Sequence, residues 1–338
     1  MKLSVIVPVY RAEATLRACA ESILQNAPDD LELELELILV DDGSPDGSGA
    51  LCDALAREDP RVTALHRPNG GAAAARNTGL AAAGGEYITF VDADDALLPG
   101  TWAAVLPALE ALSPDLYGFG VLRADGTPEC GPEGVYPAPG ALGEAELARL
   151  LVDTGVLVAP YAKCYRAALL RHNGIRFDEA LAVNEDFLFN LHFLAVCGRL
   201  AFGPGAFYRY NDGSTGSLSR RLRDDLLAAE RYTRPALEKT LAALGLAPDA
   251  AARLLARRRL HCAKAQFGLL AGQKGRLPLA RRAAVFREVL AVPGARDALL
   301  ADYRADPNRL LALPYRFCLR LGLPGLLAVY CAAKSRFL

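Results

Sequence analysis

The sequence contains no uninterrupted apolar run of about 18 residues, so it predicts no membrane-spanning helix. The apolar segment over residues 1–8 is too short for a signal peptide, and Arg11 and Glu13 follow it at once. The net charge of −1 provides no overall attraction to nucleic acid. From these absences we expect a cytoplasmic protein without a nucleic-acid partner.

No Cys-x-x-Cys pair occurs among the eight cysteines, which excludes the usual zinc-knuckle and thioredoxin patterns. Several cysteines lie in apolar helical patterns and are best interpreted as small hydrophobic residues in a reducing cytosol. The four histidines also lack metal-ligand spacing, so each is interpreted as a polar or partly buried side chain. They are His66, His172, His192 and His261.

The chain of 338 residues is long enough for more than one domain, and its 52% hydrophobic and 23% charged content is that of a globular protein. Short apolar strands are expected at 3–9, 35–40, 62–66 and 87–91, with a helical pattern after each. This alternation predicts an α/β fold with a mostly parallel, doubly wound, Rossmann-like sheet.

Beyond residue 112 the expected elements become more varied. They are a strand at 115–122, a Gly- and Pro-rich excursion at 124–143, helices at 144–152 and from 184, and a strand at 205–210. Segment 161–166 is expected to lead into another helix. From about 223 onward the pattern is helical, with a single last helix over 307–334. We therefore expect a first domain over 1–220 and an all-helical region over 221–338.

Carboxylates follow two of the expected strands. Asp92, Asp94 and Asp95 come directly after the strand at 87–91, and Asp41 and Asp42 follow the strand at 35–40. Ligands of open α/β sheets bind beyond the carboxyl ends of the strands. Clustered like charges need a compensating cation, and a hard divalent ion shared with a diphosphate would supply it. The alternative is a solvated acidic turn that caps the next helix.

Two helix starts carry further candidates. Gly70 and Gly71 precede a small-residue helix whose free amides could hold an anion, although such a helix could simply pack close to the sheet. Asn184 is a suitable N-cap before Glu185 and Asp186, and a capped helix with first-turn acids is the alternative there.

Four segments, in this order, resemble the inverting family-2 glycosyltransferases with the GT-A fold. They are Ser4-Val5-Ile6-Val7-Pro8-Val9-Tyr10, Val40-Asp41-Asp42-Gly43-Ser44, Arg76-Asn77-Thr78-Gly79 and Phe90-Val91-Asp92-Ala93-Asp94-Asp95. The pair Glu185-Asp186 and the segment Tyr208-Arg209-Tyr210 with Ser217-Leu218-Ser219 also fit members that build bacterial polysaccharides and surface glycans. The resemblance covers about residues 1–220.

This resemblance implies a nucleotide-sugar donor, with UDP favoured, and a glycan or lipid-linked acceptor. The residues that it implies for the donor are Pro8, Val9, Tyr10, Asp41 or Asp42 for the base, Gly71 and Arg76 along the nucleotide, and Asp92 and Ala93. Asp94, with Asp92, would hold Mg²⁺ or Mn²⁺ on the diphosphate, whereas Asp95 would be a structural acid.

Asp186 is implied as the general base that takes the proton of the acceptor hydroxyl. A carboxylate in a first helical turn and near a cation should have a lowered pKa, which would weaken it as a base, so acceptor binding and desolvation would have to offset this effect. Glu185 is a lesser candidate, with a first-turn acid of a capped helix as the alternative. The resemblance also suggests Lys163 for phosphate or acceptor contact, or else a solvated lysine, and Arg209 and Arg220 for the diphosphate, or else surface ion pairs.

The end of the chain, residues 310–321, mixes apolar and basic residues without an acid. Such a segment suits peripheral contact with an anionic membrane, and packing against the first domain or a homodimer partner is the alternative. Two other functions compete with glycosyl transfer. A sugar nucleotidyltransferase would usually have a Gly-rich loop after the first strand, which is absent from residues 10–13, and a non-catalytic nucleotide-sugar-binding protein would not need intact acids at 92, 94 and 186.

Overall fold

The computed structural model describes residues 1–25, 34–211, 225–272, 277–305 and 313–337. By their internal contacts, the residues divide into two compact units. One comprises Met1–Ser217 with Ala236–Ala247, and the other comprises Leu218–Pro235 with Pro248–Leu338. The chain returns to the first unit within the helix α8 (Leu226–Ala243), between Pro235 and Ala236, and leaves it again after Ala247.

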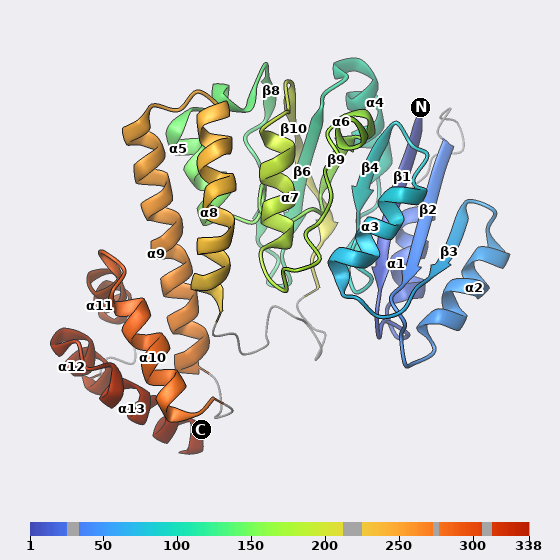
Figure 1. Cartoon of the computed structure of the whole chain (residues 1–338). Helices are drawn as coiled ribbons and strands as arrows, with labels where there is room; N and C mark the ends of the chain where they lie inside the picture. The colour runs from blue at the N-terminus through green and yellow to red at the C-terminus, as the bar shows by residue number, and fades with distance from the viewer. Residues whose placement is uncertain (26–33, 212–224, 273–276, 306–312, 338) are drawn as a thin grey trace. The chain divides into compact units, whose positions relative to one another are not determined.

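A mixed, mostly parallel sheet forms the centre of the first unit, as predicted (Figure 1). Strand β1 (Lys2–Val9) lies between β2 (Glu34–Asp41) and β4 (Tyr87–Phe90), and β3 (Val62–His66) pairs with β2; all three pairings are parallel. Farther along, β6 (Leu116–Leu122) pairs in parallel with β10 (Leu200–Arg209). The carboxyl ends of β1, β2 and β4 therefore lie at the same edge of the sheet.

One strand in the middle of the sheet is absent from the sequence prediction. β9 (Lys163–Arg166) runs antiparallel between β4 and β6, before the short helix α6 (Ala167–His172). The segment is only four residues long and two of them are basic, so it gives little apolar signal. Its partners on β4 and β6 are more than 40 residues away in the sequence, so local sequence does not reveal the pairing.

Helices cover both faces of the sheet. In Figure 1, α3 (Ala72–Ala82) and α7 (Glu185–Leu194) lie in front of the strands and α1 (Leu16–Leu24) lies behind them. Alternate residues of β1, such as Val5 and Val7, join the core cluster that includes α1. On the other face, a Cβ on Gly79 would lie 2.4 Å from Cγ2 of Ile6, so α3 needs small residues to pack this closely.

The remaining elements of this unit are short, apart from the helices α2 (Ser48–Glu58) and α4 (Thr101–Leu112). The short ones are β5 (Ala96–Leu97), β7 (Pro128–Glu129), β8 (Gly134–Tyr136), a 3-10 turn at Pro139–Leu142, and α5 (Gly143–Ala148) with a π-helical turn at Arg149–Asp153. The Gly- and Pro-rich excursion thus contains two strands, of which β7 pairs with β6 and β8 with β10.

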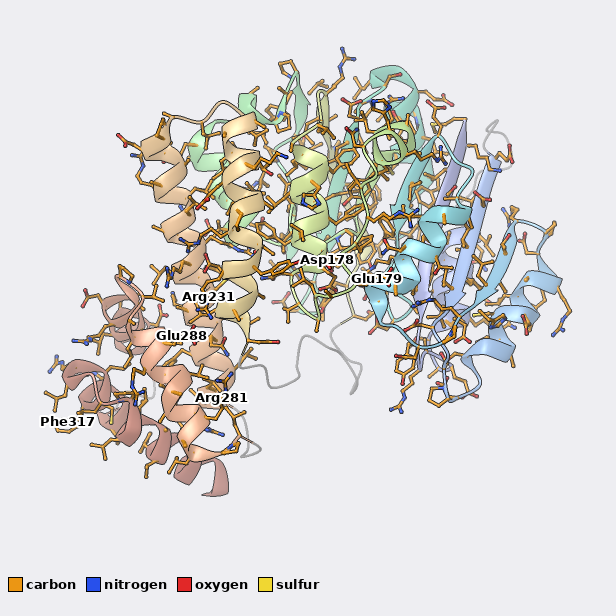
Figure 2. All side chains as sticks on the ribbon, in the orientation of Figure 1. Asp178, Glu179, Arg231, Arg281, Glu288 and Phe317 are labelled. Carbon is orange, nitrogen blue, oxygen red and sulfur yellow. The ribbon has the colours of Figure 1, made fainter. Side chains whose placement is uncertain are left out.

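The second unit is helical and has a core of its own, in which the rings of Phe267 and Phe286 lie 5.2 Å apart. Its helices after α8 are α9 (Pro248–Gly272), α10 (Leu279–Leu290), α11 (Ala295–Ala305), α12 (Leu313–Leu321) and α13 (Pro324–Phe337). Arg231 on α8 forms an ion pair with Glu288 on α10, and Figure 2 shows the two side chains next to each other.

The prediction of a single last helix over 307–334 was wrong. Gly322, with φ of 63°, ends α12 in the left-handed conformation that glycine tolerates best. Pro324 then starts α13, where its missing N–H costs nothing. Within the described ranges, every helix is too short or too polar to span a bilayer.

Candidate active site

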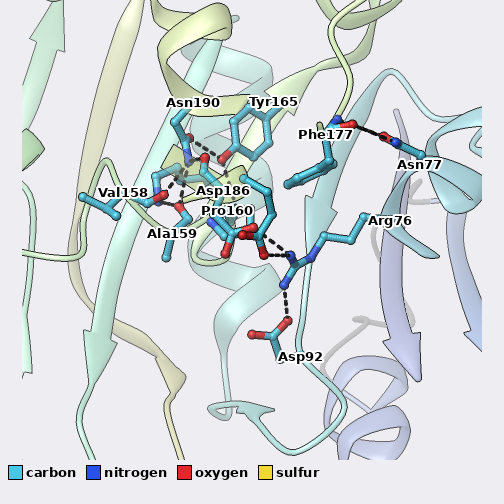
Figure 3. Close-up of polar contacts among 12 residues, drawn as sticks. Arg76, Asn77, Asp92, Val158, Ala159, Pro160, Tyr165, Phe177, Asp186 and Asn190 are labelled. Atoms are coloured by element: carbon cyan, nitrogen blue, oxygen red, sulfur yellow. Dashed lines mark hydrogen bonds and ion pairs between the residues drawn. The ribbon is translucent and has the colours of Figure 1, made fainter. Parts of the chain in front are cut away.

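Arg76 on α3 joins two acidic groups that are far apart in the sequence. Its Nη2 donates to Oδ1 of Asp92 at 2.9 Å, and its Nη1 donates to Oδ1 of Asp186 at 2.7 Å (Figure 3). Glu185 is also near, with Oε1 at 3.9 Å from Nη1. The arginine is buried, whereas the side chains of Asp92 and Asp186 are each 28% exposed. The guanidinium expected along the nucleotide therefore lies between the acids after β4 and the acid that begins α7.

Burial outweighs the lowering that a first-turn position and a nearby cation would give the pKa of Asp186. Burial raises its pKa to about 7, and the negative charges of Glu185 and Asp92 act in the same direction. Arg76 and Lys163 act in the opposite direction but do not outweigh the burial. A carboxylate with a pKa near neutrality can both hold and release a proton under physiological conditions.

Asn184 is positioned as the N-cap of α7, but its side chain makes no capping hydrogen bond. Its backbone is left-handed, with φ of 63°, and its Nδ2 is buried without a hydrogen-bond partner among the described residues. Asparagine tolerates this conformation better than most residues. The turn before Glu185 and Asp186 is therefore held by the chain around it rather than by a side-chain cap.

A buried polar network lies behind Asp186 (Figure 3). Nδ2 of Asn190 donates to the carbonyls of Asp186 at 2.9 Å, Val158 at 2.9 Å and Ala159 at 3.2 Å. The hydroxyl of Tyr165 donates to Oδ1 of Asn190 at 2.8 Å and lies 3.2 Å from the carbonyl of Pro160. These contacts fasten the first turn of α7 to segment 158–160.

Asn190 and Tyr165 were not among the residues predicted from the sequence. A signal for Asn190 was present, because it is a polar residue in an otherwise apolar stretch of α7 and lies one helical turn after Asp186. No comparable signal singles out Tyr165, since an aromatic residue in a strand is ordinary.

Lys163 is buried rather than solvated. Its amine donates to the carbonyls of Ala159 at 2.7 Å and Tyr161 at 3.0 Å, and burial lowers its pKa to about 7. It thereby closes the turn before β9, in which Ala162 has a φ of 55°. Both hydrogen bonds go to the backbone, so Lys163 acts in the structure as a support of this turn.

The acids after β4 differ from one another, as the sequence suggested. Asp95 is buried, and its two oxygens accept from the Tyr208 hydroxyl at 2.6 Å and the Asn211 backbone N–H at 2.8 Å. Burial and the charges of Asp92 and Asp94 raise the pKa of Asp95 to about 8. The Tyr208 hydroxyl also accepts from the backbone N–H of Asp92 at 3.2 Å, so Asp95 and Tyr208 support the turn that presents Asp92 and Asp94.

These acids fit a divalent ion that shares its coordination with a diphosphate. Across the described ranges, no group of three or more His, Cys, Asp or Glu side chains could hold a metal ion alone. Mg²⁺ is usually bound through one or two carboxylates together with substrate phosphates. Burial is the main cause of the raised pKa of Asp95, but the charges of Asp92 and Asp94 add to it, and a cation at these two acids would reduce that part of the shift.

The acids after β2 are fixed by neighbouring groups. Asp42 is buried and accepts from Nη1 of Arg67 at 2.6 Å and from the backbone N–H groups of Gly70 at 3.0 Å and Gly71 at 2.7 Å. A Cβ on Gly71 would meet nothing within 4 Å, so the loop is open on that side. Asp42 therefore shapes the glycine loop, and its oxygens are already engaged.

Asp41 has a different partner, which the sequence analysis did not find. Its Oδ1 accepts from the Ser44 N–H at 3.0 Å, and its Oδ2 lies 3.2 Å from Nδ1 of His66. Nε2 of His66 lies 2.9 Å from Oδ1 of Asp53. Hydrogen bonds to Asp53 and Asp41 raise the pKa of His66. The spacing of these residues in the sequence gave no indication of this bridge.

At the end of β1, Tyr10 is 43% exposed, whereas Val9 is buried in the core and can offer only its backbone to a ligand. Ala93 is also buried. Arg209 is exposed at the end of β10, opposite Ala96 of β5. Arg220, the segment Ser217-Leu218-Ser219 and the expected boundary near residue 220 lie outside the described residues.

Residues 4–129 match the family model described as glycosyl transferase family 2. The chain is 30% identical over 213 residues to EpsJ of Bacillus subtilis, an uncharacterized glycosyltransferase, covering 62% of this chain and 61% of EpsJ. It is 31% identical over 239 residues to the succinoglycan biosynthesis protein ExoO of Rhizobium meliloti, covering 66% of this chain and 64% of ExoO. The chain therefore spans a little over three fifths of the length of these relatives.

Among solved structures, the chain is similar to residues 1–349 of S. aureus TarS in complex with UDP-GlcNAc. The TM-score is 0.65 at 22% identity, and the match covers 100% of this chain and 92% of that one. This likeness shows a shared fold. The matched residues 4–129 belong to glycosyltransferase family 2, and they lie in a unit with the GT-A fold.

Proposed function

We propose that this chain is an inverting glycosyltransferase that moves a sugar from a nucleotide-diphospho-sugar to a hydroxyl of a glycan or lipid-linked acceptor. The observation that carries the proposal is the bridge formed by Arg76, which brings Asp186 next to the acids at the end of β4. The family match and the position of these acids at the carboxyl edge of the sheet support it. The TarS complex with UDP-GlcNAc favours a UDP-sugar, and the role of ExoO in succinoglycan biosynthesis favours surface polysaccharide assembly.

In this proposal, Asp186 is the general base. Its pKa of about 7 leaves a substantial fraction ionised at neutral pH and still gives it affinity for a proton. It removes the proton of the acceptor hydroxyl while that oxygen attacks the anomeric carbon on the face opposite the leaving diphosphate. A single displacement of this kind inverts the configuration, as in inverting glycosidases, where the base also acts from the face opposite the leaving group.

The donor would lie across the ends of β1, β2 and β4. The exposed ring of Tyr10, with the backbone of Pro8 and Val9, offers a wall for the nucleotide base, and Asp41 or Asp42 would accept a hydrogen bond from it. The open side of Gly71 lets the nucleotide approach the loop, and Ala93 lies between the two acids of the Asp-x-Asp pattern.

Asp94 and Asp92 would hold Mn²⁺ or Mg²⁺, of which Asp94 is the direct ligand and Asp92 a ligand or a contact through water or sugar. When bound, such an ion supplies charge neutralisation to the departing diphosphate. Oδ1 of Asp92 already accepts from Arg76, which leaves its Oδ2 for this role. Arg76 also keeps Asp92 oriented, so the protein itself contributes one positive charge to the site.

The proposed roles of the two regions of the chain and of the lesser candidate residues follow from their positions in the sequence and the fold. Residues 1–220 form the catalytic domain in this proposal, and 221–338 contact the acceptor, a membrane surface or a second copy of the chain. Arg209 and Arg220 would approach the diphosphate from the end of β10, and Glu185 adds negative charge beside Asp186. None of the eight cysteines, all within the described ranges, forms a disulfide, and this supports a cytoplasmic location.

The proposal is tested by Asp186→Asn, which removes the base but keeps the size of the side chain. We expect the release of UDP in the presence of acceptor to fall at least about hundredfold, while calorimetry still detects donor binding. Glu185→Gln in the same helical turn is the matched control and should keep most of the activity. Near wild-type transfer by Asp186→Asn would show that another group is the base.

The donor itself can be identified by a thermal-shift screen of nucleotide sugars with and without Mn²⁺, because a ligand that binds the folded state raises the melting temperature. Release of pyrophosphate from a nucleoside triphosphate and a sugar phosphate would instead indicate a nucleotidyltransferase. Donor binding without dependence on a metal ion, and without transfer to any acceptor, would indicate a binding protein.

A further inference from the structure

The last two helices expose large apolar side chains to an unusual degree. Phe317 and Leu321 on α12 are 58% and 56% exposed, and Leu326 and Val329 on α13 are 54% and 49% exposed. Phe317 and Leu321 are four residues apart, and Leu326 and Val329 are three apart, so each pair shares one face of its helix. We call these four residues the α12–α13 apolar face. Figure 2 shows Phe317 at the outer edge of the helical unit.

This face is additional to the one that builds the core. Cys318 and Leu319 of α12, and Leu327, Ala328 and Cys331 of α13, are buried in the core of the helical unit. An ordinary surface helix buries one apolar stripe and presents polar residues on the other side. Since both helices are apolar on their outer side as well, we expect that side to have a partner of its own.

The charge next to the apolar face has a single sign. Arg316 and Arg320 lie one helical turn apart on α12, immediately before Phe317 and Leu321. The sequence of 313–337 contains two further basic residues, Lys334 and Arg336, and no acid.

Two carboxylates elsewhere in the helical unit have cationic partners of their own. Glu288 forms an ion pair with Arg231, and Oδ2 of Asp302 lies 3.0 Å from Nζ of Lys264. These two acids have cationic partners other than the arginines of α12, and the single sign of charge in 313–337 favours an anionic partner for this surface.

We propose that the α12–α13 apolar face, together with Arg316 and Arg320, binds an anionic lipid surface. Leucine and phenylalanine side chains would enter the boundary between headgroups and acyl chains, and the arginines would reach the phosphates. A second copy of the chain fits less well. A two-fold interface places the same patch on both sides. The arginines of the two copies would then face each other, and 313–337 contains no acid that could neutralise them.

The test is co-sedimentation of the full chain with phosphatidylcholine vesicles that either contain or lack phosphatidylglycerol. We expect binding only to the vesicles with phosphatidylglycerol, and a decrease in binding when salt is raised. Phe317→Ser with Leu321→Ser should weaken the binding at least about tenfold, because two apolar side chains that would be transferred from water into the membrane are removed. Arg316→Gln with Arg320→Gln should weaken it about tenfold at low salt, and much less at high salt.

The matched control is Tyr232→Ser with Leu279→Ser, which removes two exposed apolar side chains from α8 and α10 of the same unit. This variant should bind vesicles as the wild type does. All the substituted side chains are at least partly exposed, so the variants should keep the wild-type unfolding midpoint.

Three results would overturn the proposal. The first is an absence of binding to anionic vesicles, and the second is equal binding by the serine variant of α12. The third is a dimer in sedimentation velocity that the serine substitutions on α12 convert to a monomer, which would make this face a contact between copies of the chain. The assay does not require turnover, so its outcome is independent of the proposed glycosyl transfer.

Discussion

Replacing Arg76 by methionine should destabilise the protein and should do so most strongly at alkaline pH. The guanidinium is buried and holds Asp92 at 2.9 Å and Asp186 at 2.7 Å, with Glu185 nearby at 3.9 Å. Methionine keeps most of the packing against the ring of Phe177, whose centroid lies 5.3 Å from Cζ of Arg76. The substitution therefore removes mainly the positive charge and its hydrogen bonds.

The expected loss in the free energy of unfolding depends on the two acids that remain without Arg76. Removal of one partner of a buried ion pair typically costs 3–5 kcal/mol, because the other charge is left uncompensated. Here the two acids are each 28% exposed, so water can solvate them in part. We therefore expect a loss of about 3 kcal/mol in the free energy of unfolding, at the lower end of that range.

The cost of Arg76→Met should increase with pH. Without Arg76, the carboxyl of Asp186 loses the positive charge that favours its ionised form, so its pKa rises further above the ordinary value. At about pH 5 this carboxyl is protonated with or without Arg76, so the substitution costs little there, whereas at about pH 8 the wild-type carboxyl is mostly ionised and benefits from Arg76. The cost of Arg76→Met should thus be clearly smaller at about pH 5 than at about pH 8.

Urea unfolding of both proteins at the two pH values measures this difference. Arg17→Met is the matched control, because Arg17 forms a 2.8 Å ion pair with Glu58 in which both side chains are about half exposed. An exposed pair contributes only about 0–1 kcal/mol, so this control should change little. If Arg76→Met costs below about 1 kcal/mol at about pH 8, or the same at both pH values, then the bridge does not stabilise the site as argued.

Two other predictions follow from the same site. The rate of transfer should fall as the pH is lowered through about 7, because Asp186 must be ionised to accept a proton; a flat profile from about pH 5 to 9 would argue against this base. Tyr165→Phe should cost about 1–3 kcal/mol in urea unfolding, since Oδ1 of Asn190 loses the hydroxyl that donates to it at 2.8 Å inside the protein. An unchanged midpoint would mean that water or a shift of Asn190 replaces this bond.

Local patterns were enough to predict the parallel part of the sheet. The strands β1, β2, β3 and β4 are short apolar segments bounded by turns, and this pattern reports burial directly. The antiparallel strand β9 escaped prediction because two of its four residues are Lys163 and Arg166, and their burial depends on partners from β4 and β6. Propensity fails where the tertiary environment decides the conformation.

The acids of the site could be located from the sequence, but their chemistry could not. A first-turn position near a cation suggested a lowered pKa for Asp186, and only its burial within the fold raises the value to about 7. Asp42 and Asp41 are adjacent, yet one holds the glycine loop and the other faces His66. Neighbours in the sequence diverge in this way because their side chains leave the strand end in different directions.

The sequence argument also required a cation to compensate the clustered acids, and it supplied only a divalent ion. Arg76 is a second compensating charge, and it is part of the fold. It acts on Asp92 and Asp186, whereas Asp95 is left with a pKa of about 8. The protein therefore supplies a compensating charge to the base side of the cluster by itself, and burial keeps Asp95 largely protonated at neutral pH. A metal ion on a diphosphate would then act mainly with Asp92 and Asp94.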